Sequence, residues 1–122
     1  HDFDLEDVAT QSSETLSGGQ RRRLEIARTM ASRPQVVLLD EPFAGVDPIS
    51  IEGLQTAIRG IRDSGVAVLI TDHNVRDTLE LVDRAVLIDR GTVLIEGTPA
   101  EITSDETARN RYFGERFNYE RL

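Results

Sequence analysis

The chain has 122 residues, a formal net charge of −8 at pH 7 and no cysteine. This length suits one domain or a piece of a larger one. All 14 basic residues are arginine and the 22 carboxylates outnumber them, so the net basic face that nucleic-acid binding favours is missing, and we expect no nucleic-acid partner. The lack of cysteine excludes a disulfide framework and a thiolate zinc site. The apolar runs are far shorter than the ~20 residues of a membrane-spanning helix.

The first ordered element is predicted to be a helix that begins near residue 16. Residues 1–15 are polar and acidic without a clear period, and we interpret them as a linker or the remnant of an upstream part. Ser17 and Gln20 have the spacing of a capping box, and Arg33 followed by Pro34 indicates where the helix stops. Its predicted buried face consists of Leu24, Ala27, Met30 and Ala31.

Two short apolar runs, at residues 36–39 and 66–70, predict strands that are buried on both faces. Between them, Asp47 as N-cap and Pro48 at the first helical position predict a second helix that ends at Gly65. The buried stripe of this helix is expected to be Ile51, Leu54, Ile58 and Ile61. A third helix follows residue 74, with an apolar face of Val75, Leu79 and Val82.

The last part of the chain is predicted to contain a hairpin and further helices. Residues 85–88 and 92–96 are two strands joined across Asp89, Arg90 and Gly91. A second capping box, between Thr98 and Glu101, opens a short helix, and residues 105–113 are expected to be helical. Strands that alternate with helices predict an α/β fold with a mostly parallel sheet flanked by helices.

The stretch from Ser17 to Gln20, which reads SGGQ, has two interpretations. It is either an ordinary capped helix start or a glycine-rich helix N-terminus whose free N–H groups hold phosphate oxygens. The three arginines that follow, at residues 21–23, are more typical of a solvated face than of a ligand site.

Two adjacent carboxylates, Asp40 and Glu41, follow the first predicted strand. Ligands of open α/β sheets bind at the carboxyl ends of strands. Asp40 is suited to hold Mg²⁺ through water, and Glu41 could orient or deprotonate an attacking water. The alternative is a strand end with two solvated acids.

A histidine, His73, holds the equivalent position after the second predicted strand. Its imidazole could donate a hydrogen bond to a γ-phosphate oxygen, although a lone histidine is more often structural. Asp47 is sufficiently explained as an N-cap when it is considered alone.

Taken in order, the motifs LSGGQ, VVLLDEP, GVDP and ITDH resemble the second half of an ATP-binding-cassette (ABC) transporter ATPase. The resemblance implies the carboxyl-terminal part of a RecA-like P-loop NTPase domain over residues 16–117, followed by a tail at residues 118–122. It also implies that Glu41 and His73 are catalytic and that Asp40 serves the Mg²⁺ ion through water. The implied nucleotide-binding residues are Leu16, Ser17, Gly18, Gly19, Gln20 and Asp47.

The family resemblance further implies the ligands, partners and location of the protein. The expected ligands are ATP and Mg²⁺, and the expected partners are a second ATPase subunit in a head-to-tail homodimer and the transmembrane subunits of a transporter. The expected location is the cytoplasmic face of the inner membrane. The segments EPFAGVDPIS, LITDHNVRDTLEL and EGTPAEI are most similar to those of the ATPases of lipopolysaccharide export. The alternative is the ATPase of branched-chain amino-acid importers, which have a similar RRLEIAR helix and GTP-x-E-I tail.

The sequence departs from the family pattern in one respect: the phosphate loop G-x-x-x-x-G-K-[ST] requires a lysine, and the chain contains none. We therefore expect a carboxyl-terminal fragment of an ATPase that is inactive alone, although a naturally non-catalytic interaction or regulatory fragment is the alternative. In this class the phosphate-loop strand lies between the strand that precedes His73 and the strand at residues 85–88. Its absence would leave two strand edges unpaired with a gap between them. We expect either marginal stability with self-association through those edges, or a gap that is filled by a neighbouring molecule or closed by direct pairing of the two strands.

Overall fold

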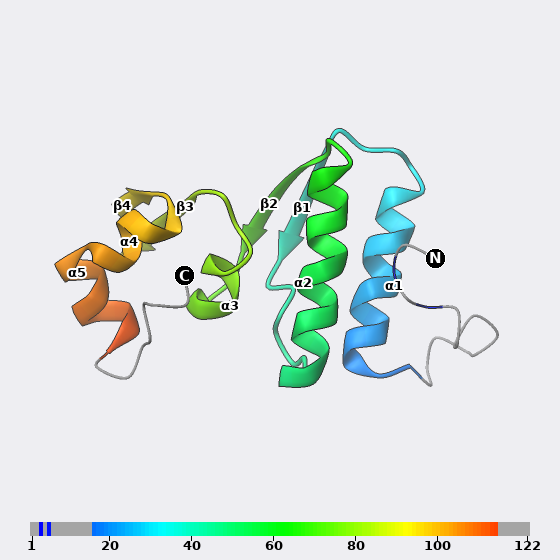
Figure 1. Cartoon of the computed structure of the whole chain (residues 1–122), viewed down its shortest axis with the longest axis horizontal. Coiled ribbons are helices and arrows are strands. Elements are labelled where there is room, and N and C mark those ends of the chain that lie inside the picture. The colour runs from blue at the N-terminus through cyan, green and yellow to red at the C-terminus, as the bar shows by residue number, and fades with distance from the viewer. Residues whose placement is uncertain (1–2, 4, 6–15, 115–122) are drawn as a thin grey trace. The chain divides into compact units, whose positions relative to one another are not determined.

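The computed structural model describes residues 3, 5 and 16–114, which form two compact units, His1–Asn74 and Val75–Leu122. Each unit is described by itself (Figure 1). The linker predicted at residues 1–15 lies outside the described residues except for positions 3 and 5, and the tail predicted at residues 118–122 lies wholly outside them. Among the described residues, no helix is both long and apolar enough to span a membrane.

The first unit contains two parallel strands and two long helices. Its elements are α1 (Gly18–Met30), β1 (Val36–Asp40), α2 (Pro48–Asp63) and β2 (Ala67–Thr71). The strands pair in parallel without a shift, from Val36 opposite Ala67 to Asp40 opposite Thr71. Parallel neighbours need a crossover connection, which α2 supplies. Figure 1 shows α1 and α2 side by side, with α2 against the strands.

Both predicted helix starts of this unit are confirmed. The Ser17 hydroxyl accepts a hydrogen bond from the Gln20 N–H at 3.2 Å, and the Gln20 side chain accepts one from the Ser17 N–H at 3.0 Å. The N-cap of α2 is Asp47, with Pro48 at the first helical position. The predicted buried face of α1 was partly wrong, because Ile26 is the buried apolar side chain of this helix while Ala31 is an exposed C-cap residue.

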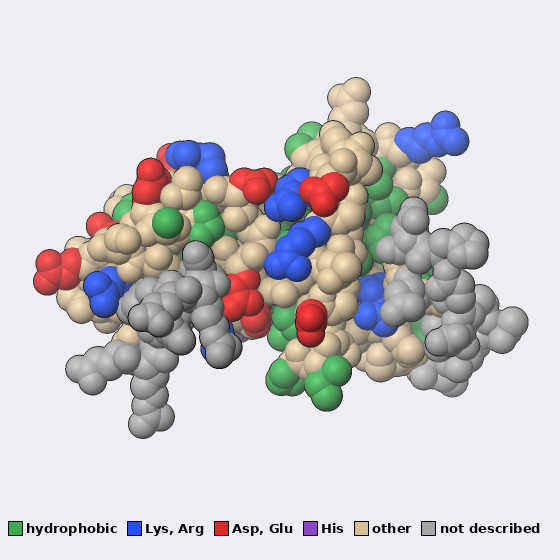
Figure 2. Space-filling model, viewed as in Figure 1, with side chains coloured by type: hydrophobic (Ala, Val, Ile, Leu, Met, Phe, Trp, Pro, Cys, Tyr) green, Lys and Arg blue, Asp and Glu red, His purple; other side chains and the backbone are tan. Residues whose placement is uncertain are grey.

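The α2 helix is amphipathic, with Leu54, Ile58 and Ile61 buried as predicted and Ala57 beside them. Ile51, also predicted in this stripe, is only half-buried. Figure 2 shows acidic and basic side chains interspersed along the outward face of the helix. A band of apolar side chains on one face and charges on the other is what a helix packed against a sheet requires. The helix thus supplies half of the buried apolar side chains that the structure describes in the first unit.

Burial of both faces of the strands was predicted and is wrong for the described residues. In β1, Val37 is 1% exposed, whereas its neighbours Val36 and Leu38 are 56% and 71% exposed. In β2, Leu69 is 60% exposed. Successive strand residues point to opposite faces, so the alternation shows one covered face and one bare apolar face.

The second unit is built around an antiparallel hairpin. Its elements are α3 (Val75–Leu79), β3 (Ala85–Asp89), β4 (Thr92–Gly97), α4 (Pro99–Ser104), α5 (Glu106–Ala108) and the π-helix η3 (Arg109–Phe113). The predicted hairpin is confirmed, and its turn residues Arg90 and Gly91 have φ angles of 48° and 79°. Two consecutive positive φ angles are the mark of a type I′ turn. The core consists of Leu79, Ile102, Ala108 and Phe113.

The α/β fold class is confirmed, but the strands form two separate pairs. The β1–β2 pair is parallel and the β3–β4 pair is antiparallel. Within the part of the chain that the structure describes, β2 and β3 do not pair with each other. The direct pairing that was one expected outcome is therefore not found, and self-association through these edges stays a prediction.

Candidate functional site

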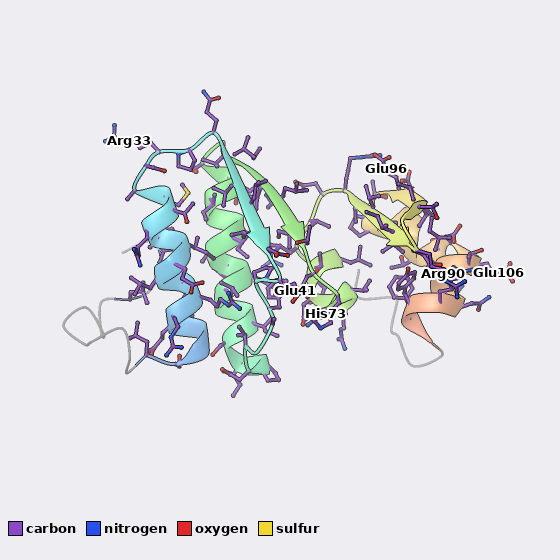
Figure 3. The ribbon with its side chains drawn as sticks, turned by 180° about the vertical axis from the view of Figure 1, so that it is seen from behind. Arg33, Glu41, His73, Arg90, Glu96 and Glu106 are labelled. Carbon is purple, nitrogen blue, oxygen red and sulfur yellow. The ribbon has the colours of Figure 1, made fainter. Side chains whose placement is uncertain are left out.

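Three of the predicted site residues meet at the carboxyl ends of the two parallel strands. Asp40 ends β1, Glu41 follows it, and His73 lies just beyond β2. Figure 3 shows Glu41 and His73 next to each other, and the His73 Nδ1 atom lies 3.4 Å from the Glu41 Oε1 atom. The His73 side chain is 76% exposed and the Glu41 side chain is 54% exposed. An acid and an imidazole that are close together and open to solvent can both reach a bound ligand.

Glu41 has an unusual backbone conformation, with a φ angle of 47°. The left-handed region costs a residue other than glycine roughly 1 kcal/mol or more. The Glu41 N–H donates to the Thr71 carbonyl oxygen at 2.6 Å, so the first residue after β1 is still held to the neighbouring strand. Backbone strain of this kind is often found at functional sites. The backbone conformation of Glu41 therefore indicates a functional role independently of its place at the strand end.

Asp40 is held in place across the strand pair. The Thr71 hydroxyl donates to the Asp40 Oδ1 atom at 2.6 Å, and Asp40 is exposed. The second carboxylate oxygen of Asp40 has no hydrogen-bond partner within the described part of the chain. One carboxylate with several waters and phosphate oxygens is a common environment for Mg²⁺. No group of three or more metal-ligating side chains was found among the described residues.

The glycine-rich start of α1 packs tightly against the rest of the unit. A Cβ atom at Gly19 would lie 2.6 Å from the Ser50 Cβ atom, and one at Gly18 would lie 3.3 Å from the Gly45 carbonyl oxygen. The Arg22 Nη2 atom donates to the Ala44 carbonyl oxygen at 3.5 Å. The two glycines therefore have a packing role that the sequence alone did not reveal.

Leu16, Ser17 and Gln20 complete the predicted nucleotide-binding stretch. Leu16 is buried, and it anchors the segment that leads into α1. Ser17 and Gln20 form the capping box, and Ser17 is exposed. In the first helical turn Gly18 is exposed, Gly19 is buried, and the Gln20 N–H is bonded to the Ser17 hydroxyl.

Asp47 caps α2 and is exposed. Its Oδ2 atom accepts a hydrogen bond from the Ser50 N–H at 3.0 Å. Hydrogen bonds from the Ser50 side chain, and next from its backbone N–H, hold the pKa of Asp47 below its ordinary value. Asp47 is therefore a carboxylate at neutral pH, with one face committed to the helix N-terminus.

The structure thus places the predicted residues in two groups within one unit. Asp40, Glu41 and His73 share the strand ends, whereas residues 16–20 and Asp47 lie at the starts of the two helices. The groups are linked by the loop between β1 and α2, which begins at Glu41 and ends at Asp47.

Two residues that contact this site were not singled out from the sequence. Thr71 holds Asp40, and Asp72 has a side chain that is fully buried and accepts hydrogen bonds from the N–H groups of Phe43 and Asn74. The spacing of Asp72 to Asn74 is that of an Asx-turn, so the bond to Asn74 could have been predicted from the local sequence. The bond to Phe43 has no local signal.

The class of protein follows from fold and family together. Residues 1–44 match the family model described as "ABC transporter". A solved structure, the ADP conformation of MJ1267, an ATP-binding cassette of an ABC transporter, is similar with a TM-score of 0.81 and 26% identity, over 93% of this chain and 46% of that chain. A nucleotide-free ATP-binding cassette from an ABC transporter is similar with a TM-score of 0.80. The chain is similar to ABC transporter ATPases in sequence and in fold, which confirms the resemblance inferred from the motifs.

Two curated proteins are identical to this chain at about half of the aligned positions. The lipopolysaccharide export system ATP-binding protein LptB of Escherichia coli (strain K12) is 50% identical over 116 residues, which are 95% of this chain and 48% of that protein. A probable ABC transporter ATP-binding protein of Azorhizobium caulinodans is 53% identical over 95% of this chain and 41% of that protein. The chain spans less than half the length of these relatives.

Proposed function

We propose that residues 16–117 are the carboxyl-terminal half of the ATPase domain of an ABC transporter, and that the whole protein hydrolyses ATP to power transport. The observation that carries this proposal is the grouping of Asp40, Glu41 and His73 at the ends of two parallel strands, with 3.4 Å between the Glu41 and His73 side chains. The similarity to ABC transporter ATPases supports it, because these positions match the family's motifs in order.

In the proposed mechanism each residue of the strand-end group has a separate task. The Glu41 carboxylate orients a water molecule and accepts its proton as that water attacks the γ-phosphate. His73 faces Glu41 with Nδ1, which leaves Nε2 as the ring nitrogen that can donate to a phosphate oxygen. Asp40, held by Thr71, would bind Mg²⁺ through water. That ion, when bound, neutralises charge on the phosphates.

The second group serves a different ATP in this proposal. Leu16, Ser17, Gly18, Gly19 and Gln20, with Asp47, would complete the nucleotide site of a second ATPase subunit in a head-to-tail homodimer. The exposed Ser17 and Gly18 at the start of α1 support this role, because the N-terminus of a helix favours phosphate oxygens. The transmembrane subunits of the transporter would be the further partners, at the cytoplasmic face of the inner membrane.

Lipopolysaccharide is the proposed cargo. The 50% identity to a protein named for lipopolysaccharide export supports it, whereas the similar Azorhizobium protein has no cargo in its name. A branched-chain amino-acid importer is the alternative. Depletion of the full-length protein should reduce lipopolysaccharide at the cell surface and leave uptake of labelled leucine unchanged. The reverse result would favour the importer.

The decisive test of the enzyme proposal is Glu41→Gln in the full-length protein. The amide keeps the shape of the side chain but cannot accept the proton of water, so turnover should fall by roughly 10²–10⁴-fold while ATP still binds. The matched control is Glu106→Gln, the same change at an exposed residue of α5, which should leave turnover unchanged. Turnover of Glu41→Gln within a few-fold of the parent would show that Glu41 is not the general base.

The isolated chain of 122 residues is expected to be inactive. It contains no lysine, so the charge-assisted contacts of a phosphate loop are missing from it. Titration calorimetry should detect no tight binding of Mg-ATP, and micromolar affinity would contradict this expectation. A G-x-x-x-x-G-K-[ST] motif in the coding sequence upstream of His1 would favour the enzyme over a non-catalytic interaction or regulatory fragment.

A further inference from the structure

Asp72 is the buried polar residue closest in sequence to the strand-end group, and it connects both loops of that group. Its Oδ2 atom accepts a hydrogen bond from the Phe43 N–H at 3.0 Å, and its Oδ1 atom accepts one from the Asn74 N–H at 2.8 Å. The side chain of Asp72 is 0% exposed, whereas that of its neighbour His73 is 76% exposed. A buried carboxyl group is costly unless its oxygens are hydrogen-bonded, and both oxygens of Asp72 are.

The two donors lie on the two loops that carry the proposed catalytic side chains. Phe43 follows Glu41 by two residues and is itself 3% exposed, so its backbone is anchored in the core. Asn74 directly follows His73. The Asp72 Oδ1 atom also lies 3.8 Å from the His73 Nδ1 atom, the same nitrogen that faces Glu41. One carboxyl group therefore holds the chain on either side of the 3.4 Å contact between Glu41 and His73.

The backbone of Glu41 explains why such a tie is needed. Its φ angle of 47° is disfavoured for glutamate, so the loop would relax to another conformation unless nearby contacts held it. Two hydrogen bonds hold the loop near Glu41 to the end of β2: the Glu41 N–H donates to the Thr71 carbonyl oxygen, and the Phe43 N–H donates to Asp72. Only the second depends on a side chain.

We propose that Asp72 is a positioning residue, which fixes the loop of Glu41 relative to His73 so that the two side chains face one water and one phosphate. This inference rests on the proposed ATPase function. Asp72 does not touch the reacting atoms in this account. Its effect is on the geometry of the groups that do, and a displacement of about 1 Å in such groups can slow a reaction roughly a hundredfold.

The test compares Asp72→Asn and Asp72→Ala in the full-length protein, with steady-state kinetics in ATP at saturating Mg²⁺. Asparagine keeps one acceptor oxygen and turns its NH₂ group toward the other donor, whereas alanine removes both acceptors. We expect kcat to fall about tenfold or more for Asp72→Asn and further for Asp72→Ala, with KM for ATP within about twofold of the parent. The matched control is Asp63→Asn, which makes the same change at a 68% exposed side chain near the end of α2 and should leave both constants unchanged.

A kcat of Asp72→Asn within about twofold of the parent would overturn the inference. So would a loss of activity that equals the loss of folded protein in thermal unfolding, or one in which KM rises as much as kcat falls. Hydrogen exchange in the parent protein gives a test that needs no variant. The Phe43 amide should exchange as slowly as the amides of β1, and fast exchange would show that Asp72 does not hold the loop.

Glu41→Gln, measured alongside, separates this inference from the function on which it rests. If Glu41→Gln keeps its turnover, Glu41 is not the general base, and the inference that Asp72 positions it for catalysis fails with that role. If Glu41→Gln is inactive and Asp72→Asn is fully active, the function stands and only the positioning role of Asp72 is overturned.

Discussion

The two units use their strands in opposite ways. In the first unit, β1 and β2 run parallel, so that both carboxyl ends reach the same edge and Asp40, Glu41 and His73 meet there. In the second unit, β3 and β4 run antiparallel and are joined by a tight turn. Polar residues at its strand ends serve that turn or the next helix. A parallel pair thus gathers side chains from distant parts of the sequence, and a hairpin does not.

Several polar side chains of the second unit form helix caps or ion pairs within that unit. Thr98 and Glu101 form a capping box, and Asp105 accepts a hydrogen bond from the Ala108 N–H at 2.8 Å. Asp89 forms an ion pair with Arg111. In the first unit, by contrast, the Glu41 and His73 side chains remain largely exposed. Groups left open to solvent are available to a ligand.

The largest expected effects come from truncating the centre of each core. Leu54 in the first unit and Ile102 in the second are both 0% exposed, and Leu54→Ala or Ile102→Ala should each cost about 2–5 kcal/mol of stability. If the units are separate cooperative elements, Leu54→Ala should speed hydrogen exchange in β1 and β2 but not in β3 and β4, and Ile102→Ala should do the reverse.

Ile49→Ala is the control for this comparison, because Ile49 is 89% exposed. Its truncation should change stability by no more than about 0.5 kcal/mol. Faster exchange in all four strands after either core truncation would show that the two units unfold as one.

An intermediate effect is expected at the start of α1. Gly19→Ala places a Cβ atom 2.6 Å from the Ser50 Cβ atom, and the helix must move to accommodate it, at a cost of about 1–3 kcal/mol. Ser50→Gly in the same protein should recover part of this loss. The change would be measured as a shift in the midpoint of urea unfolding.

Gly60→Ala provides the opposite case, since a Cβ atom at Gly60 would have no neighbour within 4 Å. In the interior of α2 this change should stabilise the protein by about 0.5–1 kcal/mol. If Gly19→Ala destabilised the protein no more than Gly60→Ala does, this result would contradict the close packing of α1 against α2.

The smallest effect is expected in the hairpin turn. Gly91 has a φ angle of 79°, and Gly91→Ala should cost about 1 kcal/mol because alanine disfavours that region. Arg90→Asn, at a φ angle of 48°, should be neutral or slightly stabilising, because asparagine tolerates the left-handed conformation. Chemical unfolding of both variants would measure the difference. A loss on Arg90→Asn as large as that on Gly91→Ala would argue against a type I′ turn.

Features that depend on neighbours in sequence were predicted well. The capping boxes at Ser17 and Thr98, the N-cap at Asp47 and the hairpin turn each have a signal within four residues, and each is confirmed. The meeting of the strand-end residues also followed from the sequence, because parallel strands place their carboxyl ends together.

Features that depend on distant partners were not predicted. The apolar run at residues 36–39 indicates a strand, but it does not indicate which face of the strand is covered. Leu38, in the middle of this run, is 71% exposed. Thr71 is typical of any strand, so its bond to Asp40 had no signal of its own. The bond between Asp72 and the Phe43 N–H joins residues 29 positions apart, and no periodicity encodes it.

The left-handed backbone of Glu41 has a consequence for how this position can vary. Glycine or asparagine would adopt a φ angle of 47° at lower cost than glutamate does. A selection for thermal resistance alone should therefore enrich those two residues at position 41. A selection for transport should retain glutamate, so that the two selections would rank the same substitutions in opposite order.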